Sequence, residues 1–140
     1  MISPQKKKYV LDSYAVLCYL QDEPGSDKMA SFLEKAQQNE IELYMTWVNF
    51  GEVYYRVWRE YSKGEANKIA ELVEQWPLKM LSADKDFCLT AASIKAENAL
   101  AYADAFAIAA SMLIKGALVT GDPEIQKASD KVDFELLWLE

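Results

Sequence analysis

Hydrophobic residues along the chain form short uninterrupted runs, and segments with helical periodicity separate these runs. An apolar run without polar alternation is typical of a strand that is covered on both faces of a parallel sheet. The pattern predicts strands at 9–12, 41–46, 78–83, 116–121 and 134–140. It predicts helices at 13–21, 26–38, 47–61, 62–76 and 84–98, and a further helix in the apolar segment that begins at residue 101.

Strands that alternate with one or two helices pair in parallel through right-handed crossovers, which predicts a three-layer α/β sandwich. Ser26 and Asp84 stand where two of the helices are expected to begin, and both residue types are good N-caps. A length of 140 residues, of which 51% are hydrophobic, fits a single domain with its own core. We place this domain at 8–140, and we interpret residues 1–7 and the run KKK at 6–8 as a solvated tail.

Composition excludes several classes of function. The chain has no histidine, which removes Ser-His and Cys-His nucleophiles, and Cys18 and Cys88 are too isolated for a zinc site. A net charge of −7 argues against a broad basic surface for nucleic acid, although a local patch or a bound metal can still attract it. The sequence has no apolar run of membrane-spanning length and no signal peptide, so we expect a cytoplasmic protein without membrane association.

Three aspartates stand at the edges of apolar segments. Asp12 and Asp122 end the strands predicted at 9–12 and 116–121, and Asp104 lies near the start of an apolar helix. Ligands of open α/β sheets bind beyond the carboxyl ends of the strands, so these acids can converge there. Carboxylates in such a cluster repel one another unless a cation joins them, and Mg²⁺ prefers oxygen ligands of this kind. The pattern favours phosphodiester hydrolysis by metal-activated water.

Helix capping is the competing interpretation of the same acids. The sequence GDPE at 121–124 has the form of a helix start, with Asp122 as the N-cap and proline at the first position. Ser13 can cap the first helix in place of Asp12, which leaves that aspartate free for another role. Asp104 can interact favourably with the dipole of its own helix. The sequence alone leaves both interpretations open.

Four segments together resemble PIN domains, in particular the VapC-type toxin ribonucleases of prokaryotic toxin–antitoxin pairs. The segments are VLDSYAVL, VNFGEVYYR, ALAYADAFAIAAS and LVTGDPE, in the order of the family. The resemblance implies a sheet with strand order 3-2-1-4-5 and an acidic cluster of Asp12, Glu52, Asp104 and Asp122. It also implies supporting roles for Ser13 and Thr120, a further acid at Glu124, a homodimer and a protein antitoxin.

Glu52 is implied by the resemblance alone. A helical wheel of 47–61 puts it on the polar side, away from the apolar stripe of Trp47, Phe50, Tyr54, Val57, Trp58 and Tyr61. Arg56 lies one turn further on, so an exposed ion pair is the alternative role for Glu52. If the polar side borders the crevice, Arg56 or Arg59 can contact substrate phosphates. We interpret the aromatic stripe as core and subunit interface rather than as a base-stacking platform.

We therefore expect a Mg²⁺- or Mn²⁺-dependent endoribonuclease, the toxin of a VapBC-type pair. Asp12, Asp104 and Asp122 are expected to bind the metal, and Glu52 to bind it or to orient the attacking water. Two alternatives remain. One is a PIN-domain nuclease that processes RNA without being a toxin, and the other is a PIN-fold module that binds RNA or protein without useful turnover.

Overall fold

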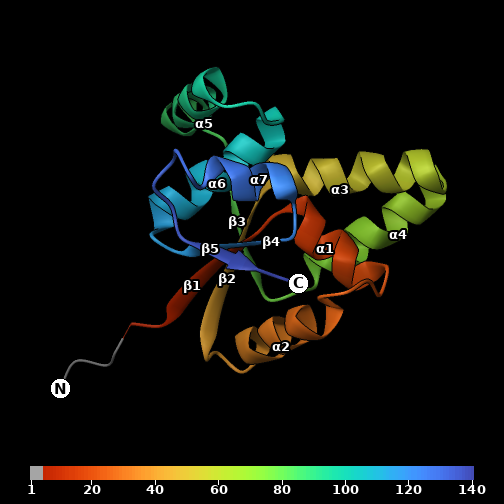
Figure 1. The fold of residues 1–140 in the computed structure, drawn as a ribbon. Coiled ribbons are helices and arrows are strands. Elements are labelled where there is room, and N and C mark those ends of the chain that lie inside the picture. Colours follow the sequence, from red (N-terminus) through yellow and green to blue (C-terminus); the bar gives the residue numbers. More distant parts are fainter. Residues whose placement is uncertain (1–4) are drawn as a thin grey trace.

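The computed structural model describes residues 5–140, in which a five-stranded parallel sheet lies between two layers of helices (Figure 1). The strand order is β3-β2-β1-β4-β5, so the predicted sandwich and its strand order are both confirmed. Every pairing is parallel, and β1 lies at the centre between β2 and β4. The strands are β1 (Lys7–Leu11), β2 (Ile41–Thr46), β3 (Leu78–Leu81), β4 (Ala117–Thr120) and β5 (Leu136–Trp138).

Seven helices in the described part of the chain cover the two faces of this sheet. They are α1 (Ser13–Leu20), α2 (Ser26–Gln37), α3 (Trp47–Glu60), α4 (Lys63–Glu74), α5 (Lys85–Glu97), α6 (Tyr102–Ile114) and α7 (Pro123–Ala128). One core cluster joins the sheet to α5, α6 and α7, and the other joins it to α1, α2, α3 and α4. Successive residues of the central strands enter opposite clusters: Val10 and Leu118 face one core, whereas Leu11 and Val119 face the other.

The most apolar segments take the most buried places. All four residues of β4 are buried, and residues 104–111 of α6 are buried without interruption. A helix that is apolar on every side is stable only where protein surrounds it, and α6 meets this condition by packing against β1, β2, β4, α3 and α5. Asp104 is therefore the first residue of the uninterrupted buried stretch of α6, and the helix carries it into the interior.

The structure corrects three expectations near the amino end of the chain. β1 begins at Lys7, two residues before the predicted strand, so Lys7 and Lys8 belong to the sheet rather than to a tail. Both lysines are in register with β2, opposite Ile41 and Glu42. Ser26 is the first residue of α2 and does not cap it; Gly25 is the cap, in the left-handed conformation with φ 103°. Residues 1–4 of the predicted tail lie outside the described residues.

The outer strands are also shorter than predicted. The strands predicted at 78–83 and 134–140 are the two edge strands of the sheet, and both predictions were too long. β3 ends at Leu81, and β5 covers only Leu136–Trp138. Asp84 caps α5 as expected, and its side chain accepts a hydrogen bond from the backbone N–H of Phe87. No helix of residues 5–140 combines the length and the apolar character needed to cross a membrane.

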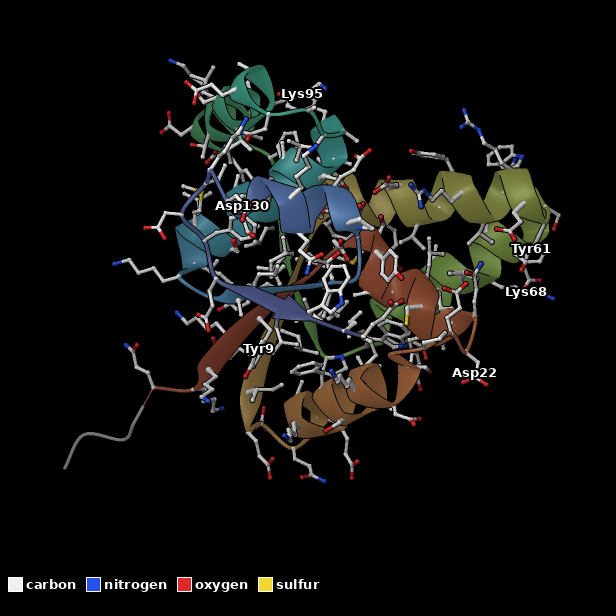
Figure 2. All side chains as sticks on the ribbon, in the orientation of Figure 1. Tyr9, Asp22, Tyr61, Lys68, Lys95 and Asp130 are labelled. Carbon is white, nitrogen blue, oxygen red and sulfur yellow. The ribbon has the colours of Figure 1, made fainter. Side chains whose placement is uncertain are left out.

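Helices α3 and α4 form a hairpin that extends away from the sheet (Figure 1). Tyr61 lies towards the outer end of this hairpin (Figure 2) and is exposed. The predicted apolar stripe of α3 is confirmed in part: Val57 is buried, and Phe50 and Tyr54 pack against the core. It is wrong for Trp47, Trp58 and Tyr61, which are all exposed. The buried residues of α3 are Asn49, Glu52, Val53 and Val57. The helix thus turns two polar side chains inward and leaves its largest aromatic residues at the surface.

Candidate functional site

The carboxyl ends of β1 and β4 lie side by side at the point where the strand order of the sheet reverses. Leu11 is paired with Val119, which places Asp12 next to Thr120. Open α/β sheets bind ligands at such a point because the loops that follow the two strands diverge there. Asp122 follows β4 by two residues, so the two acids that end predicted strands do come to the same edge of the sheet.

Asp12 is 1% exposed and caps α1. Its Oδ1 accepts a hydrogen bond of 2.8 Å from the backbone N–H of Ala15, and its Oδ2 accepts one from the hydroxyl of Thr120. Burial raises the pKa of Asp12 to about 7, although these hydrogen bonds act in the opposite direction. The charges of Asp104 and Asp122 raise it further. The expectation that Ser13 could cap this helix in place of Asp12 is wrong.

Thr120 connects the two strand-end acids. Its hydroxyl donates to Asp12 and accepts a hydrogen bond of 3.0 Å from the backbone N–H of Asp122. The Oδ1 of Asp122 accepts from the backbone N–H of Glu124, so Asp122 caps α7 as the capping interpretation states. Asp12 and Asp122 are therefore helix caps and neighbours in one acidic cluster at the same time. The two interpretations of the sequence do not exclude each other.

Asp104 lies in the first turn of α6 and is 6% exposed. Within residues 5–140 its carboxylate has neither a hydrogen-bond partner nor an ion-pair partner. Burial raises its pKa to about 7, and the negative charges of Asp122, Glu52 and Glu124 add to this effect. Arg56 alone among its named neighbours lowers the pKa. The surroundings of Asp104 therefore favour either a proton or a bound cation.

Glu52 is 5% exposed and borders the other acids from α3. Ser13 donates a hydrogen bond to its Oε1, and Arg56 Nη2 lies 3.3 Å from its Oε2. The ion pair expected from the spacing is present, but the expectation that Glu52 is exposed is wrong. A neutral donor and a half-exposed arginine now explain how a buried glutamate is satisfied.

The predicted cations differ in their positions. Arg56 is in contact with Glu52, whereas Arg59 lies over the ring of Tyr55 at 5.0 Å from its centroid. Both arginines line one open hollow together with Leu17 and Gln21 of the α1 region. Glu124 is exposed at the start of α7 and acts on the cluster through its charge. Arg56 is thus the cation at the edge of the acidic cluster, and Arg59 is further along α3.

Asn49 is a residue of this region that the sequence did not indicate. It is fully buried, one turn before Glu52, and it joins α3 to the backbone of Ala103 beside Asp104. The sequence signal for it is that Asn49, Glu52 and Val53 fall on one face of the helix. The aromatic residues obscure that face because their hydrophobicity dominates any average over the helix.

The donor chemistry of the cluster fits a hard divalent cation. Asp12, Glu52, Asp104 and Asp122 offer carboxylate oxygens, with no thiol or imidazole among them, and this is the ligand type of Mg²⁺ and Mn²⁺. In residues 5–140, no three such groups already converge closely enough to hold an ion. The acids therefore lie near one another without a closed coordination shell. The cation that forms an ion pair with this cluster is Arg56, through Glu52.

A family model described as PIN domain matches residues 9–131 of the chain. No curated protein is significantly similar in sequence. Among solved structures, VapBC2 from Rickettsia felis, bound to a DNA fragment from their promoter, has a TM-score of 0.74 at 13% identity, over 95% of this chain and 99% of that one. DNA-bound VapBC from Salmonella typhimurium has a TM-score of 0.72 at 12% identity, over 96% and 99%.

A third similar structure is VapC20 of Mycobacterium tuberculosis, which is described as a toxin that cleaves the sarcin–ricin loop. Its TM-score is 0.66 at 11% identity, and the match covers 87% of this chain and 95% of that one. At these identities the solved structures support the fold, and the family assignment comes from the match over residues 9–131.

Proposed function

The chain belongs to the PIN domain family, and from this premise we propose that it is a divalent-metal-dependent endoribonuclease, the toxin of a VapBC-type toxin–antitoxin pair. One observation carries the proposal: Asp12 and Asp104 are buried beside Asp122 and Glu52 at the switch point of the sheet. Burying like charges together costs stability, so a function that uses the charge is the better explanation.

We propose that Asp12, Asp104 and Asp122 bind Mg²⁺ or Mn²⁺, with Glu52 and Glu124 at the margin of the site. Such an ion, when bound, helps water to lose a proton near neutral pH and offsets charge on the oxygen that leaves phosphorus. It also reduces the repulsion between an acidic pocket and the phosphates of RNA.

The chain's own residues hold the acids in place for this task. Thr120 directs Oδ2 of Asp12 by donating a hydrogen bond to it, and Ser13 does the same for Oε1 of Glu52. The guanidinium of Arg56 has donors that face solvent, and these suit a phosphate oxygen of the substrate. We propose that Arg59, one turn further along α3, contacts the RNA further from the scissile bond.

Purified full-length protein and a labelled single-stranded RNA provide the test. Cleavage is expected with Mg²⁺ or Mn²⁺ and is expected to stop when a chelator is added. Asp104→Asn should lose this activity while its fold, followed by circular dichroism, remains. Cleavage that the chelator does not reduce would contradict the metal-dependent mechanism.

Two alternative functions are compatible with this chemistry or with this fold. A processing nuclease without a toxin role uses the same acids, and it is distinguished by the absence of a small DNA-binding antitoxin gene beside the coding sequence. A module that only binds RNA or protein gains nothing from burying Asp12 and Asp104 among other carboxylates that raise the pKa of both. We favour the toxin because the similar solved structures include a toxin and a toxin–antitoxin complex.

The antitoxin is proposed to bind between α1 and the α3–α4 hairpin. A hollow of about 530 Å³ there is lined by the apolar residues Leu17, Leu20, Val57 and Ile69 and by the ring of Tyr61. The neighbouring hollow shares Leu17 and contains Arg56 and Arg59, so a helix in the first hollow followed by an acidic segment that pairs with these arginines fits this surface. Leu20→Glu should weaken antitoxin binding at least tenfold and leave RNA cleavage unchanged.

A homodimer is proposed to form through the outward face of α3. Trp47 and Trp58 are exposed eleven residues apart, which places them on the same side of the helix. Gly51 lies between them, and a Cβ at that position would meet nothing within 4 Å. Gly51→Glu should therefore preserve the fold and convert the dimer to a monomer in sedimentation. A monomeric wild-type protein at high concentration would contradict the proposal.

A further inference from the structure

Asn49 has no exposed surface, and both ends of its side-chain amide are bonded. Its Oδ1 accepts a hydrogen bond of 2.6 Å from the hydroxyl of Thr46. Its Nδ2 donates one of 3.0 Å to the backbone carbonyl of Ala103. The Thr46 oxygen already accepts from the backbone N–H of Asn49, so its own proton is directed to Oδ1. Thr46 thereby determines which end of the amide faces α6.

The bond from Asn49 to Ala103 joins the starts of two helices that each carry an acid of the cluster. Glu52 follows Asn49 by one turn of α3, and Asp104 directly follows Ala103 in α6. The two carboxylates repel each other, since each is buried and Glu52 acts on Asp104 through its charge. A link between the two helix starts opposes this repulsion because it joins the segments that carry the two acids.

We propose that Asn49 is a positioning residue that fixes the separation between the carboxylates of Glu52 and Asp104 and so sets the affinity of the site for a divalent cation. The inference rests on the proposed function for the metal, but Asn49 itself does not reach the ion. When a residue that orients a metal ligand without binding the ion itself is removed, the affinity for the metal typically falls by about 10–100-fold.

Ser111 shows what a buried polar residue on α6 looks like without such a role. It is also buried, but its hydroxyl donates to the carbonyl of Ile108 within the same helix. It stands about two turns from Asp104, near the opposite end of α6. Ser111→Ala removes a buried hydrogen bond that lies within α6 and does not connect this helix to another element. It is therefore the matched control for the Asn49 variants.

The test compares two variants that break the link in different ways. Asn49→Leu keeps the branched shape of the side chain without its polar atoms, whereas Asn49→Ala leaves a cavity. The dissociation constant of Mn²⁺ is measured by calorimetry for the wild type and all variants, well below their melting temperatures in chelator. Both Asn49 variants should bind Mn²⁺ about 10–100-fold more weakly, and Ser111→Ala should bind as the wild type does. Weakening in Asn49→Ala alone would indicate a packing effect and would overturn the inference.

Crystal structures of the metal-free wild type and of Asn49→Leu provide a second readout that does not need the ion. The distance between the carboxylates of Glu52 and Asp104 is expected to increase in the variant. An unchanged distance overturns the inference whether or not the wild type binds metal. Failure of the wild type to bind Mn²⁺ contradicts the proposed function instead, and the carboxylate distance then decides the positioning role alone.

Discussion

Asp12 and Asp84 each follow a strand of the sheet and cap the helix that comes next. Their backbone angles nearly coincide, with φ −87° and ψ −178° at Asp12 and φ −82° and ψ −177° at Asp84. Each accepts a hydrogen bond from the backbone N–H three residues on, at 2.8 Å and 2.9 Å. In local conformation the two aspartates are the same.

Their surroundings differ because their strands differ in position. β1 is the central strand and brings Asp12 beside Thr120, whereas β3 is an edge strand and leaves Asp84 exposed. Capping uses only one oxygen of each carboxylate. The second oxygen of Asp12 is bonded to Thr120, and the charges of Asp104 and Asp122 act on the group. That an aspartate caps a helix therefore does not argue against a second role for it, which depends on the position of its strand in the sheet.

The comparison predicts the largest difference for activity. Asp12→Asn preserves the cap, since asparagine caps about as well as aspartate, but it removes one anionic oxygen from the proposed metal site. Metal-dependent RNA cleavage is expected to fall by about 100-fold or more. Asp84→Asn makes the same change of side chain at the exposed cap and should leave the rate within about twofold. Equal cleavage by both variants would remove Asp12 from the mechanism.

The stability of the metal-free protein should depend on pH in a direction set by the same acids. Burial raises the pKa of Asp12 and of Asp104 from 3.8 to about 7, so the folded state holds these protons more tightly than the unfolded state does. The two groups add stability at low pH, and this contribution is lost as the pH rises from about 4 to about 7. The loss in the free energy of unfolding is expected to be on the order of a few kcal/mol.

Urea unfolding in chelator between pH 4.5 and 7.5 measures this slope. Asp12→Asn should flatten it and raise stability at neutral pH, while Asp84→Asn should leave it as it is in the wild type. Saturating Mn²⁺ should also reduce the slope, because a bound cation replaces the protons. A wild-type slope of the opposite sign would show that the burial of these two acids is offset by interactions other than those described.

The alternation of strands and helices made the layered fold and the meeting of Asp12 with Asp122 predictable from the sequence. The inward position of Glu52 and Asn49 was not, because Trp47 and Trp58 contribute strongly to the hydrophobicity of α3 and are nevertheless exposed. Which residue caps α1 was equally hidden. Asp12 and Ser13 are both good caps, and the place where β1 ends decides between them.

A substitution at Gly121 tests whether the acidic cluster around Asp12 depends on the turn that follows β4. A Cβ at Gly121 would overlap the ring of Tyr14, which is itself held by a hydrogen bond of 2.9 Å to Glu140. Gly121→Ala must displace this ring or the turn that carries Asp122, at an expected cost of about 1–3 kcal/mol in the free energy of unfolding. Gly51→Ala is the control, since its Cβ meets open space on a helix and should stabilise the protein slightly.

Arg56 provides the smallest and most specific contrast with the Asp84 region. Its Nη2 lies 3.3 Å from Oε2 of the buried Glu52 and its side chain is 52% exposed, so removing it should lower the free energy of unfolding by about 1–2 kcal/mol. Arg56→Gln takes a cation from the acids, which should tighten Mn²⁺ binding by a few-fold, and takes a donor from the substrate, which should raise KM for RNA by a few-fold. Lys85→Gln removes the exposed cation next to Asp84 and should change neither quantity.

Titration of Mn²⁺ and steady-state cleavage at two salt concentrations measure both effects, and the rise in KM should shrink at the higher salt. If Arg56→Gln weakened Mn²⁺ binding, the arginine would be supporting Glu52 as a ligand rather than competing with the ion for it.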